Sequence, residues 1–315
     1  MKLYLFYLIF LTYLLIQVCT LEDNVNKKEV ILYQLPPLDF CNNILFEHQC
    51  IRMQYKSFPS DYTVAPMYKI NACYIGKSFS TITIGLFCYL YDKKTFFKKY
   101  DPSSDQVNYR ELCSQRNIHH TIPEMIKRYE NGNESKFINE WKHLMIVREP
   151  VKRFISGFVQ LCVLKIGVPL FNPYCYGCER NMRCFLENLY LDIESVRNNW
   201  KEPNLFIKYH FYPQSWQCDY SIFKEKYNII HYNNNKTAFY KEYLKQLDNS
   251  SIPKRDLLYV HKLMRTSKVK HSTYDKKESK YYLEELVRDS YLLKLLCKIY
   301  YDDFIEFKFD FPCTY

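Results

Sequence analysis

The sequence predicts an α/β fold in which helices flank a central parallel sheet within a single domain. Short apolar runs typical of buried strands occur at Tyr68–Ile75, Leu144–Val147 and Tyr227–Tyr232. Helical patterns separate these runs, and strands that alternate with helices are typical of parallel sheets. No internal repeat interrupts the pattern. A chain of 315 residues with 48% apolar content is long enough to bury one sizeable core.

The first strand ends in a loop suited to binding an anion. The apolar run Ile70–Ile75 stops at the tripeptide Gly-Lys-Ser (76–78), and a helix is expected from about residue 80 to Tyr91. Free backbone N–H groups at a helix start, hydroxyls and one ammonium then converge on a single point. This P-loop-like segment predicts a phosphate or sulfate site formed by Lys77, Ser78, Ser80 and Thr81.

The second strand carries another anion-binding pattern at its carboxyl end. Arg148 follows the run Leu144–Val147, Pro150 suits the first position of a helix, and Ser156 lies two turns beyond Arg148. Arg153, on the same helix, is expected to be solvated. About seventy residues separate the two patterns. Together they predict a nucleotide that is held at both of its ends.

Further elements follow from periodicity and composition. A short helix is expected at Ile122–Glu130, and a long amphipathic helix at Lys280–Tyr301. Residues 163–190 contain clustered cysteines and two prolines, so this stretch is expected to be irregular. The strand at Tyr227–Tyr232 completes the predicted sheet.

The two anion-binding segments resemble the 5′-phosphosulfate loop and the 3′-phosphate motif of the Golgi carbohydrate sulfotransferases. The similarity is to the branch that includes the chondroitin 4-O- and heparan 2-O-sulfotransferases, and it covers roughly residues 65–312. Later segments also look like landmarks of that family: HFYPQ at 210–214 followed by Cys218, HST at 271–273, IYYDDF at 299–304, and Phe307–Pro312.

The resemblance implies a reaction and a donor. The enzyme would transfer a sulfuryl group from PAPS (3′-phosphoadenylyl sulfate) to a hydroxyl of a lumenal glycan or proteoglycan chain, without a metal. Lys77 would contact the 5′-phosphosulfate and stabilise the leaving oxygen, with the backbone of Ser78–Thr81 and the Thr81 hydroxyl completing the cradle. Arg148 and Ser156 would hold the 3′-phosphate.

A hydroxyl acceptor also needs a general base, and histidine is the usual choice at neutral pH. His119 and His120 lie between the two nucleotide motifs, where related enzymes place a base, although both are equally explained as turn residues before Thr121. His210 is the alternative base or an acceptor-binding residue, unless it only holds a loop. The basic loop 268–271 either closes over the donor or is a charged surface loop.

The amino terminus predicts entry into the secretory pathway. Residues 3–20 form an apolar run between Lys2 and the pair Glu22 and Asp23, which suits a signal peptide or a signal anchor. The charges favour a lumenal body, in a type II Golgi membrane protein or, after cleavage, a secreted one. Residues 21–64 are expected to be a stem and 65–315 the sulfotransferase domain. N-glycosylation sequons begin at Asn133, Asn235 and Asn249.

The 13 cysteines predict disulfides in such a compartment. Setting aside Cys19 in the apolar run leaves an even number of cysteines. Cys175, Cys178 and Cys184 also suit zinc ligands, but no histidine lies at finger spacing, so disulfides are favoured. Cys73 and Cys88 fall on a buried strand and helix, where free thiols are an alternative.

Charge and aromatic content narrow the partners. The net charge of +10 favours an acidic partner, and 31 Tyr and 22 Phe suit either a glycan-handling surface or the codon bias of an AT-rich genome. Nucleic acid is not expected, because no nucleic-acid-binding motif is present. The acceptor is therefore expected to be an acidic or neutral glycan, and the membrane a partner if the amino-terminal segment is retained.

Two functional classes remain open. The first is the PAPS-dependent enzyme, and the second is a non-catalytic lumenal glycan-binding protein on the same scaffold. The presence of Lys77, Arg148 and Ser156 favours the enzyme, because a decayed donor site would lose such residues first. A lumenal kinase is disfavoured, because the sequence lacks a magnesium-binding acidic motif.

Overall fold

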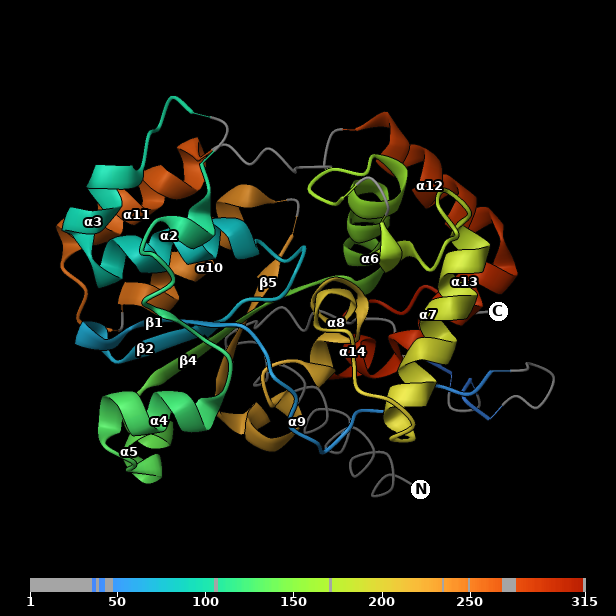
Figure 1. The fold of residues 1–315 in the computed structure, drawn as a ribbon, viewed down its shortest axis with the longest axis horizontal. Helices are drawn as coiled ribbons and strands as arrows, with labels where there is room; N and C mark the ends of the chain where they lie inside the picture. Colours follow the sequence, from blue (N-terminus) through green and yellow to red (C-terminus); the bar gives the residue numbers. More distant parts are fainter. Residues whose placement is uncertain are drawn as a thin grey trace, which may run out of the picture. The chain divides into compact units, whose positions relative to one another are not determined.

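The computed structural model describes residues 36–37, 40–42, 48–104, 107–169, 172–233, 235–248, 250–267 and 276–313. The apolar run 3–20, half of the expected stem, the sequon at Asn249 and the basic loop 268–271 lie outside these ranges. What the structure describes groups into one compact unit, as the single-domain prediction requires. Figure 1 shows its α/β architecture.

The sheet has five strands in the order β3-β1-β2-β4-β5. The three predicted strands, β2 (Ile70–Cys73), β4 (Lys142–Arg148) and β5 (Tyr227–Tyr232), are parallel, which confirms the predicted core. Two unpredicted antiparallel strands, β1 (Tyr62–Ala65) and β3 (Ile118–His119), make the sheet mixed. β1 must be antiparallel to β2 because only a tight four-residue turn connects them. The sheet therefore begins within the segment that was expected to be a stem.

The parallel register places both predicted anion sites at one edge of the sheet. Cys73 of β2 pairs with Met145 of β4, and Arg148 at the end of β4 pairs with Tyr232 at the end of β5. The carboxyl ends of parallel strands lie at the same edge, where α/β proteins bind ligands. The loop after β2 and the start of the helix after β4 therefore meet there.

Helices cover both faces of the sheet. Alternate residues of β4 point to opposite faces, so Leu144 and Ile146 join one hydrophobic cluster and Met145 and Val147 another. The first cluster is covered by α2 (Ser80–Tyr91), α3 (Lys93–Lys99), α10 (Lys236–Asp248) and α11 (Lys254–Thr266). The second is covered by α4 (Ile122–Glu130), α5 (Glu134–Glu140) and α9 (Tyr220–Phe223).

A third hydrophobic cluster lies beside the sheet and is built almost entirely from helices (Figure 1). Its elements are α6 (Pro150–Phe158), the π-helical turn η3 (Val159–Val163), α7 (Met182–Arg197), α8 (Leu205–Phe211), α12 (Lys277–Arg288), α13 (Ser290–Ile299) and α14 (Tyr301–Glu306). Short 3₁₀ turns also occur at Pro66–Tyr68, Tyr109–Glu111, Pro173–Cys175, Gln214–Trp216 and Lys224–Lys226.

The bounds of several helices differ from the prediction. The helix Ile122–Glu130 and the strand Tyr227–Tyr232 occur as expected. The predicted helix Lys280–Tyr301 is instead two helices, because Asp289 ends α12 and caps α13 by accepting hydrogen bonds from the backbone N–H groups of Tyr291 and Leu292. The stretch expected to be irregular ends in the first turns of α7.

Disulfides join every cysteine except Cys19, which lies outside the described residues. The cysteines considered as zinc ligands are oxidised, and Cys73 and Cys88 are not free. The pairs are Cys41–Cys50, Cys73–Cys218, Cys88–Cys113, Cys162–Cys175, Cys178–Cys184 and Cys297–Cys313.

The described ranges contain no group of three or more His, Cys, Asp or Glu side chains placed to hold a metal ion. None of their helices has the length and apolar character needed to cross a membrane.

Candidate active site

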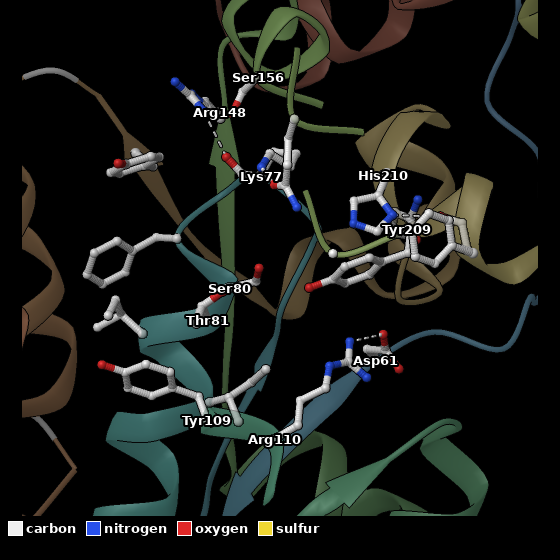
Figure 2. A pocket seen from close by; sticks show the side chains of 18 of the residues that line it. Asp61, Lys77, Ser80, Thr81, Tyr109, Arg110, Arg148, Ser156, Tyr209 and His210 are labelled. Carbon is white, nitrogen blue, oxygen red and sulfur yellow. Dashed lines mark hydrogen bonds and ion pairs between the residues drawn. The ribbon is translucent and has the colours of Figure 1, made fainter. Parts of the chain in front are cut away.

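A cavity of about 1090 Å³ opens at the carboxyl edge of the parallel strands. It is lined by most of the predicted site residues, namely Lys77, Ser80, Thr81, His120, Arg148, Ser156 and His210. Ser78 and His119 are the two that do not line it. Its other charged residues are Asp61, Arg110, Lys208 and Lys236. Figure 2 shows Arg148 and Ser156 at one end, Asp61 and Arg110 at the opposite end, and Lys77 and His210 between them.

The loop after β2 has a tightly constrained backbone. Lys77 and Phe79 adopt left-handed conformations with φ of 71° and 64°, which cost non-glycine residues energy and are common at functional sites. The Gly76 N–H donates to the carbonyl of Tyr209 at 3.1 Å, and a Cβ at Gly76 would lie 2.5 Å from that oxygen. Glycine is therefore required by this close approach.

Helix α2 opens toward the cavity with its first turn uncapped. No side chain caps it at Phe79, so the first N–H groups of the helix lack partners within it. The side chains of Ser80 and Thr81 line the cavity at this point. A helix start with adjacent hydroxyls is a suitable anion site.

Ser78 is turned away from the cavity. Its hydroxyl donates to Gln214 Oε1 at 3.2 Å, its backbone N–H donates to the carbonyl of Ile75 at 3.1 Å, and its side chain is fully buried. Ser78 therefore supports the loop from behind, and the cavity-facing part of the predicted cradle consists of Lys77, Ser80 and Thr81.

Lys77 is a cation held in a strongly unfavourable environment. Burial, together with the nearby charges of Arg148 and Arg153, lowers the pKa of Lys77 to about 7. Its ammonium contacts Gln160 Oε1, a neutral partner. An anion bound in the cavity would relieve this repulsion and restore the charge of the lysine.

The Arg148 end of the cavity combines positive charge with aromatic rings. Arg148 Nη1 donates to the carbonyl of Lys77 at 3.0 Å, and its guanidinium lies 5.3 Å from the centre of the Tyr232 ring. Phe79 and Tyr240 line the same cavity, and the ring centres of Phe79 and Tyr232 are 5.4 Å apart. This wall suits a flat aromatic group beside an anion.

The opposite end contains an acid–base pair. The pairing of Tyr62 in β1 with His119 in β3 brings Asp61 next to His120, with 3.1 Å between Asp61 Oδ1 and His120 Nδ1. This hydrogen bond raises the pKa of His120. Burial opposes the ionisation of Asp61, but the bond from His120 and the charge of Arg110, 3.3 Å away, outweigh it and lower the pKa of Asp61.

His119 points to the other side of its strand and is not in the cavity. Its Nδ1 lies 2.6 Å from Glu124 Oε1, and its Nε2 lies 2.8 Å from the hydroxyl of Tyr129. Burial lowers the pKa of His119. With both ring nitrogens engaged, His119 holds the start of α4 against the sheet.

His210 lines the cavity as a neutral imidazole. Its Nδ1 lies 2.9 Å from the carbonyl of Phe206, which can only accept, so Nδ1 carries the proton and Nε2 keeps a lone pair. Burial, with the charges of Lys77, Arg153 and Arg110, lowers the pKa of His210 to about 3. His210 therefore stays uncharged across the physiological range.

Arg153 is the clearest difference from the sequence prediction. Instead of being solvated, it is fully buried, and it donates to the carbonyls of Gly76 at 3.1 Å, Tyr212 at 2.9 Å and Tyr209 at 3.2 Å. The residues around it on α6 are almost all apolar and buried. The apolar character of these neighbours was the signal in the sequence that could have predicted a buried Arg153, because an arginine in such a helix needs internal partners.

Known proteins resemble this chain over most of its length. The model of the sulfotransferase family matches residues 60–310. An uncharacterized protein of Caenorhabditis elegans is 31% identical over 281 residues, covering 87% of this chain and 75% of its own. The putative sulfotransferase vep-2 of the same organism is 29% identical, covering 79% and 78%, and the carbohydrate sulfotransferase chst-1 is 28% identical, covering 81% and 77%.

No solved structure matches the chain. The family match spans both anion-binding segments, the acid–base pair and the whole sheet. The chain belongs to the sulfotransferase family.

Proposed function

We propose that the protein is a carbohydrate O-sulfotransferase that transfers the sulfuryl group of PAPS to a hydroxyl of a glycan or proteoglycan chain. The observation that carries this proposal is the layout of the cavity, in which Lys77 lies between an arginine end and the Asp61–His120 pair. Among the described residues that line the cavity, the basic side chains of Lys77, Arg110, Arg148, Lys208 and Lys236 outnumber the one carboxylate, Asp61, so positive charge predominates there.

The donor-binding roles follow from the Arg148 end of the cavity and from the Lys77 loop in its middle. PAPS carries a 3′-phosphate and a 5′-phosphosulfate, which match two separated anion sites. Arg148 and Ser156 would hold the 3′-phosphate, and the aromatic wall beside Arg148 would hold the purine. Lys77, Ser80 and Thr81 would hold the phosphosulfate. The sulfuryl group would then face the end occupied by Asp61.

His120 is the best-placed general base. Its Nδ1 is bonded to Asp61, which orients the ring and stabilises its protonated form, as in other acid–histidine pairs. As the acceptor oxygen bonds to sulfur, His120 Nε2 takes the hydroxyl proton. The bond between sulfur and the bridging phosphate oxygen breaks, and Lys77 stabilises the negative charge left on that oxygen. This positive charge comes from side chains, so we propose that no metal takes part.

His210 has a different role in this scheme. A pKa of about 3 makes it a weak proton acceptor. Its Nε2 lone pair can instead accept a hydrogen bond from an acceptor hydroxyl and orient the sugar. His119 supports the neighbouring base from the buried side of its strand.

The acceptor and compartment rest on separate observations. The name of chst-1 as a carbohydrate sulfotransferase favours a glycan acceptor, acidic or neutral. The six disulfides favour an oxidising compartment. We therefore propose a Golgi-lumenal enzyme that is anchored by residues 3–20, or secreted if that segment is removed. Nucleic acid is not among the proposed partners.

The test is transfer of radiolabelled sulfate from PAPS to a panel of desulfated glycosaminoglycans and neutral glycans, in EDTA. Incorporation into at least one acceptor, abolished in Lys77→Ala, is the expected result. Binding of glycans without transfer to any of them, and without binding of PAPS, would favour the non-catalytic glycan-binding alternative.

A further inference from the structure

One buried amide connects the two anion-binding segments. Gln214 follows α8, and its side chain is completely buried. Its Oε1 accepts from the backbone N–H of Arg148 at 2.9 Å and from the hydroxyl of Ser78 at 3.2 Å. Its Nε2 donates to the carbonyl of Arg148 at 2.8 Å. A single side chain therefore joins the loop after β2 to the end of β4.

Gln214 is itself held in place by α14. Asp303 Oδ2 accepts from the backbone N–H of Gln214 at 2.7 Å, and Asp303 Oδ1 accepts from that of Ser215 at 2.8 Å. Asp303 is fully buried. Its position in the segment 299–304 explains why two distant landmarks of the sequence, HFYPQ and IYYDDF, belong together. They form one frame behind the cavity.

Gln214 does not line the cavity, so any effect on the ligand must pass through Ser78 and Arg148. A ligand with two anionic ends binds more tightly than a one-ended ligand only if both sites are held at the matching distance. When that distance fluctuates, binding must fix it at a cost in conformational entropy. This cost reduces the affinity gained from the second contact.

We propose that Gln214 is a positioning residue that fixes the spacing between the Lys77 loop and the Arg148 site, so that both ends of the donor bind as a unit. The inference rests on the proposed PAPS-dependent function. It assigns to Gln214 the coupling between the two sites, while the affinity of each separate site comes from the residues that line it.

The test compares three nucleotides by calorimetry: 3′-phosphoadenosine 5′-phosphate, adenosine 5′-phosphate and adenosine 3′-phosphate. Gln214→Met keeps the volume and removes the amide. The affinity for each monophosphate should stay within about twofold of wild type, whereas the affinity for the bisphosphate should fall about tenfold. The ratio of the affinities is the readout, because general loosening of the fold would weaken all three nucleotides alike.

Asn117→Leu is the matched control. Asn117 is also a buried amide, but it does not line the cavity, and its Nδ2 donates within the sheet to Thr63 Oγ1 at 3.0 Å and to the carbonyl of Val64 at 3.4 Å. Its loss should leave the ratio of bisphosphate to monophosphate affinity unchanged. Ser78→Ala removes only one arm of the bridge and should lower the ratio in the same direction by a smaller factor, so it carries the test if Gln214→Met does not fold.

Two results would overturn the inference. One is an equal loss of affinity for all three nucleotides in Gln214→Met, and the other is an unchanged preference for the bisphosphate in both Gln214→Met and Ser78→Ala. A failure of the proposed function looks different, because the wild-type protein itself would then show no preference for the bisphosphate.

Discussion

Lys77 is the residue on which the proposed chemistry depends most. The charge on the leaving oxygen develops fully only in the transition state. Loss of the Lys77 ammonium should therefore affect turnover more than acceptor binding. Lys77→Ala should lower kcat by about a hundred- to a thousandfold while the KM for the acceptor stays close to wild type. Full activity of a folded Lys77→Ala variant on an authentic acceptor would show that this loop is not the phosphosulfate site.

The low pKa of Lys77 predicts a pH dependence of donor binding. In the free protein the pKa is about 7, whereas a bound anion favours the protonated form. Above pH 7 binding must therefore take up a proton, and affinity for 3′-phosphoadenosine 5′-phosphate should fall by up to about tenfold per pH unit. Calorimetry in two buffers of different ionisation enthalpy measures this uptake. Lys77→Met should abolish it, and uptake that persists in that variant would assign the proton elsewhere.

The acid–base pair predicts how the activity of His120 variants depends on pH. His120→Ala should lose most activity at neutral pH and recover partly as the pH rises, because a more readily ionised acceptor replaces the base. Asp61 raises the pKa of His120, so Asp61→Asn should shift the acidic limb of kcat/KM to lower pH. Wild-type rates in His120→Ala, with an inactive His210→Ala variant, would move the base to His210.

Helix α6 depends on the buried Arg153 as much as on its apolar face. Arg153→Met would remove the guanidinium donor from the carbonyls of Gly76 and Tyr212 and leave that of Tyr209 with only the Gly76 N–H, at a cost of about 3 kcal/mol of unfolding free energy. Lys152→Met is the matched control, because the neighbouring side chain is exposed and should change stability by less than about 0.5 kcal/mol. Urea unfolding measures both, and equal midpoints for the two variants would contradict the structural role of Arg153.

The molecule as a whole is predicted to depend on oxidation. The disulfide Cys73–Cys218 links the end of β2 to the segment after Gln214 across 145 residues. Removing it by the double substitution Cys73→Ala and Cys218→Ala should lower the free energy of unfolding by about 2–5 kcal/mol. Thiol titration of the unfolded lumenal part, made through the secretory pathway, should find no free cysteine. A fully reduced protein that is folded and active would contradict both the pairing and the proposed compartment.

The sequence was sufficient for the parallel core and for the meeting of the two predicted anion-binding segments at one edge of it. Strands buried on both faces are continuous apolar runs, and their carboxyl ends must share an edge, so Lys77 and Arg148 could be brought together from local pattern alone. The sequence could not tell which of His119 and His120 lines the cavity. That depends on the face of the sheet to which each side chain points.

Only the tertiary structure decided the Asp61–His120 end of the cavity and the frame behind the cavity. The strands β1 and β3 are too short to give a periodic signal, yet their pairing places Asp61 beside His120. Gln214 and Asp303 are 89 residues apart in the chain. No local sequence preference reveals that the backbone N–H of Gln214 donates to the carboxylate of Asp303. Short-range patterns determine which elements form. Hydrogen bonds between buried groups far apart in the chain determine which side chains meet, because burial leaves each of them no water to bind.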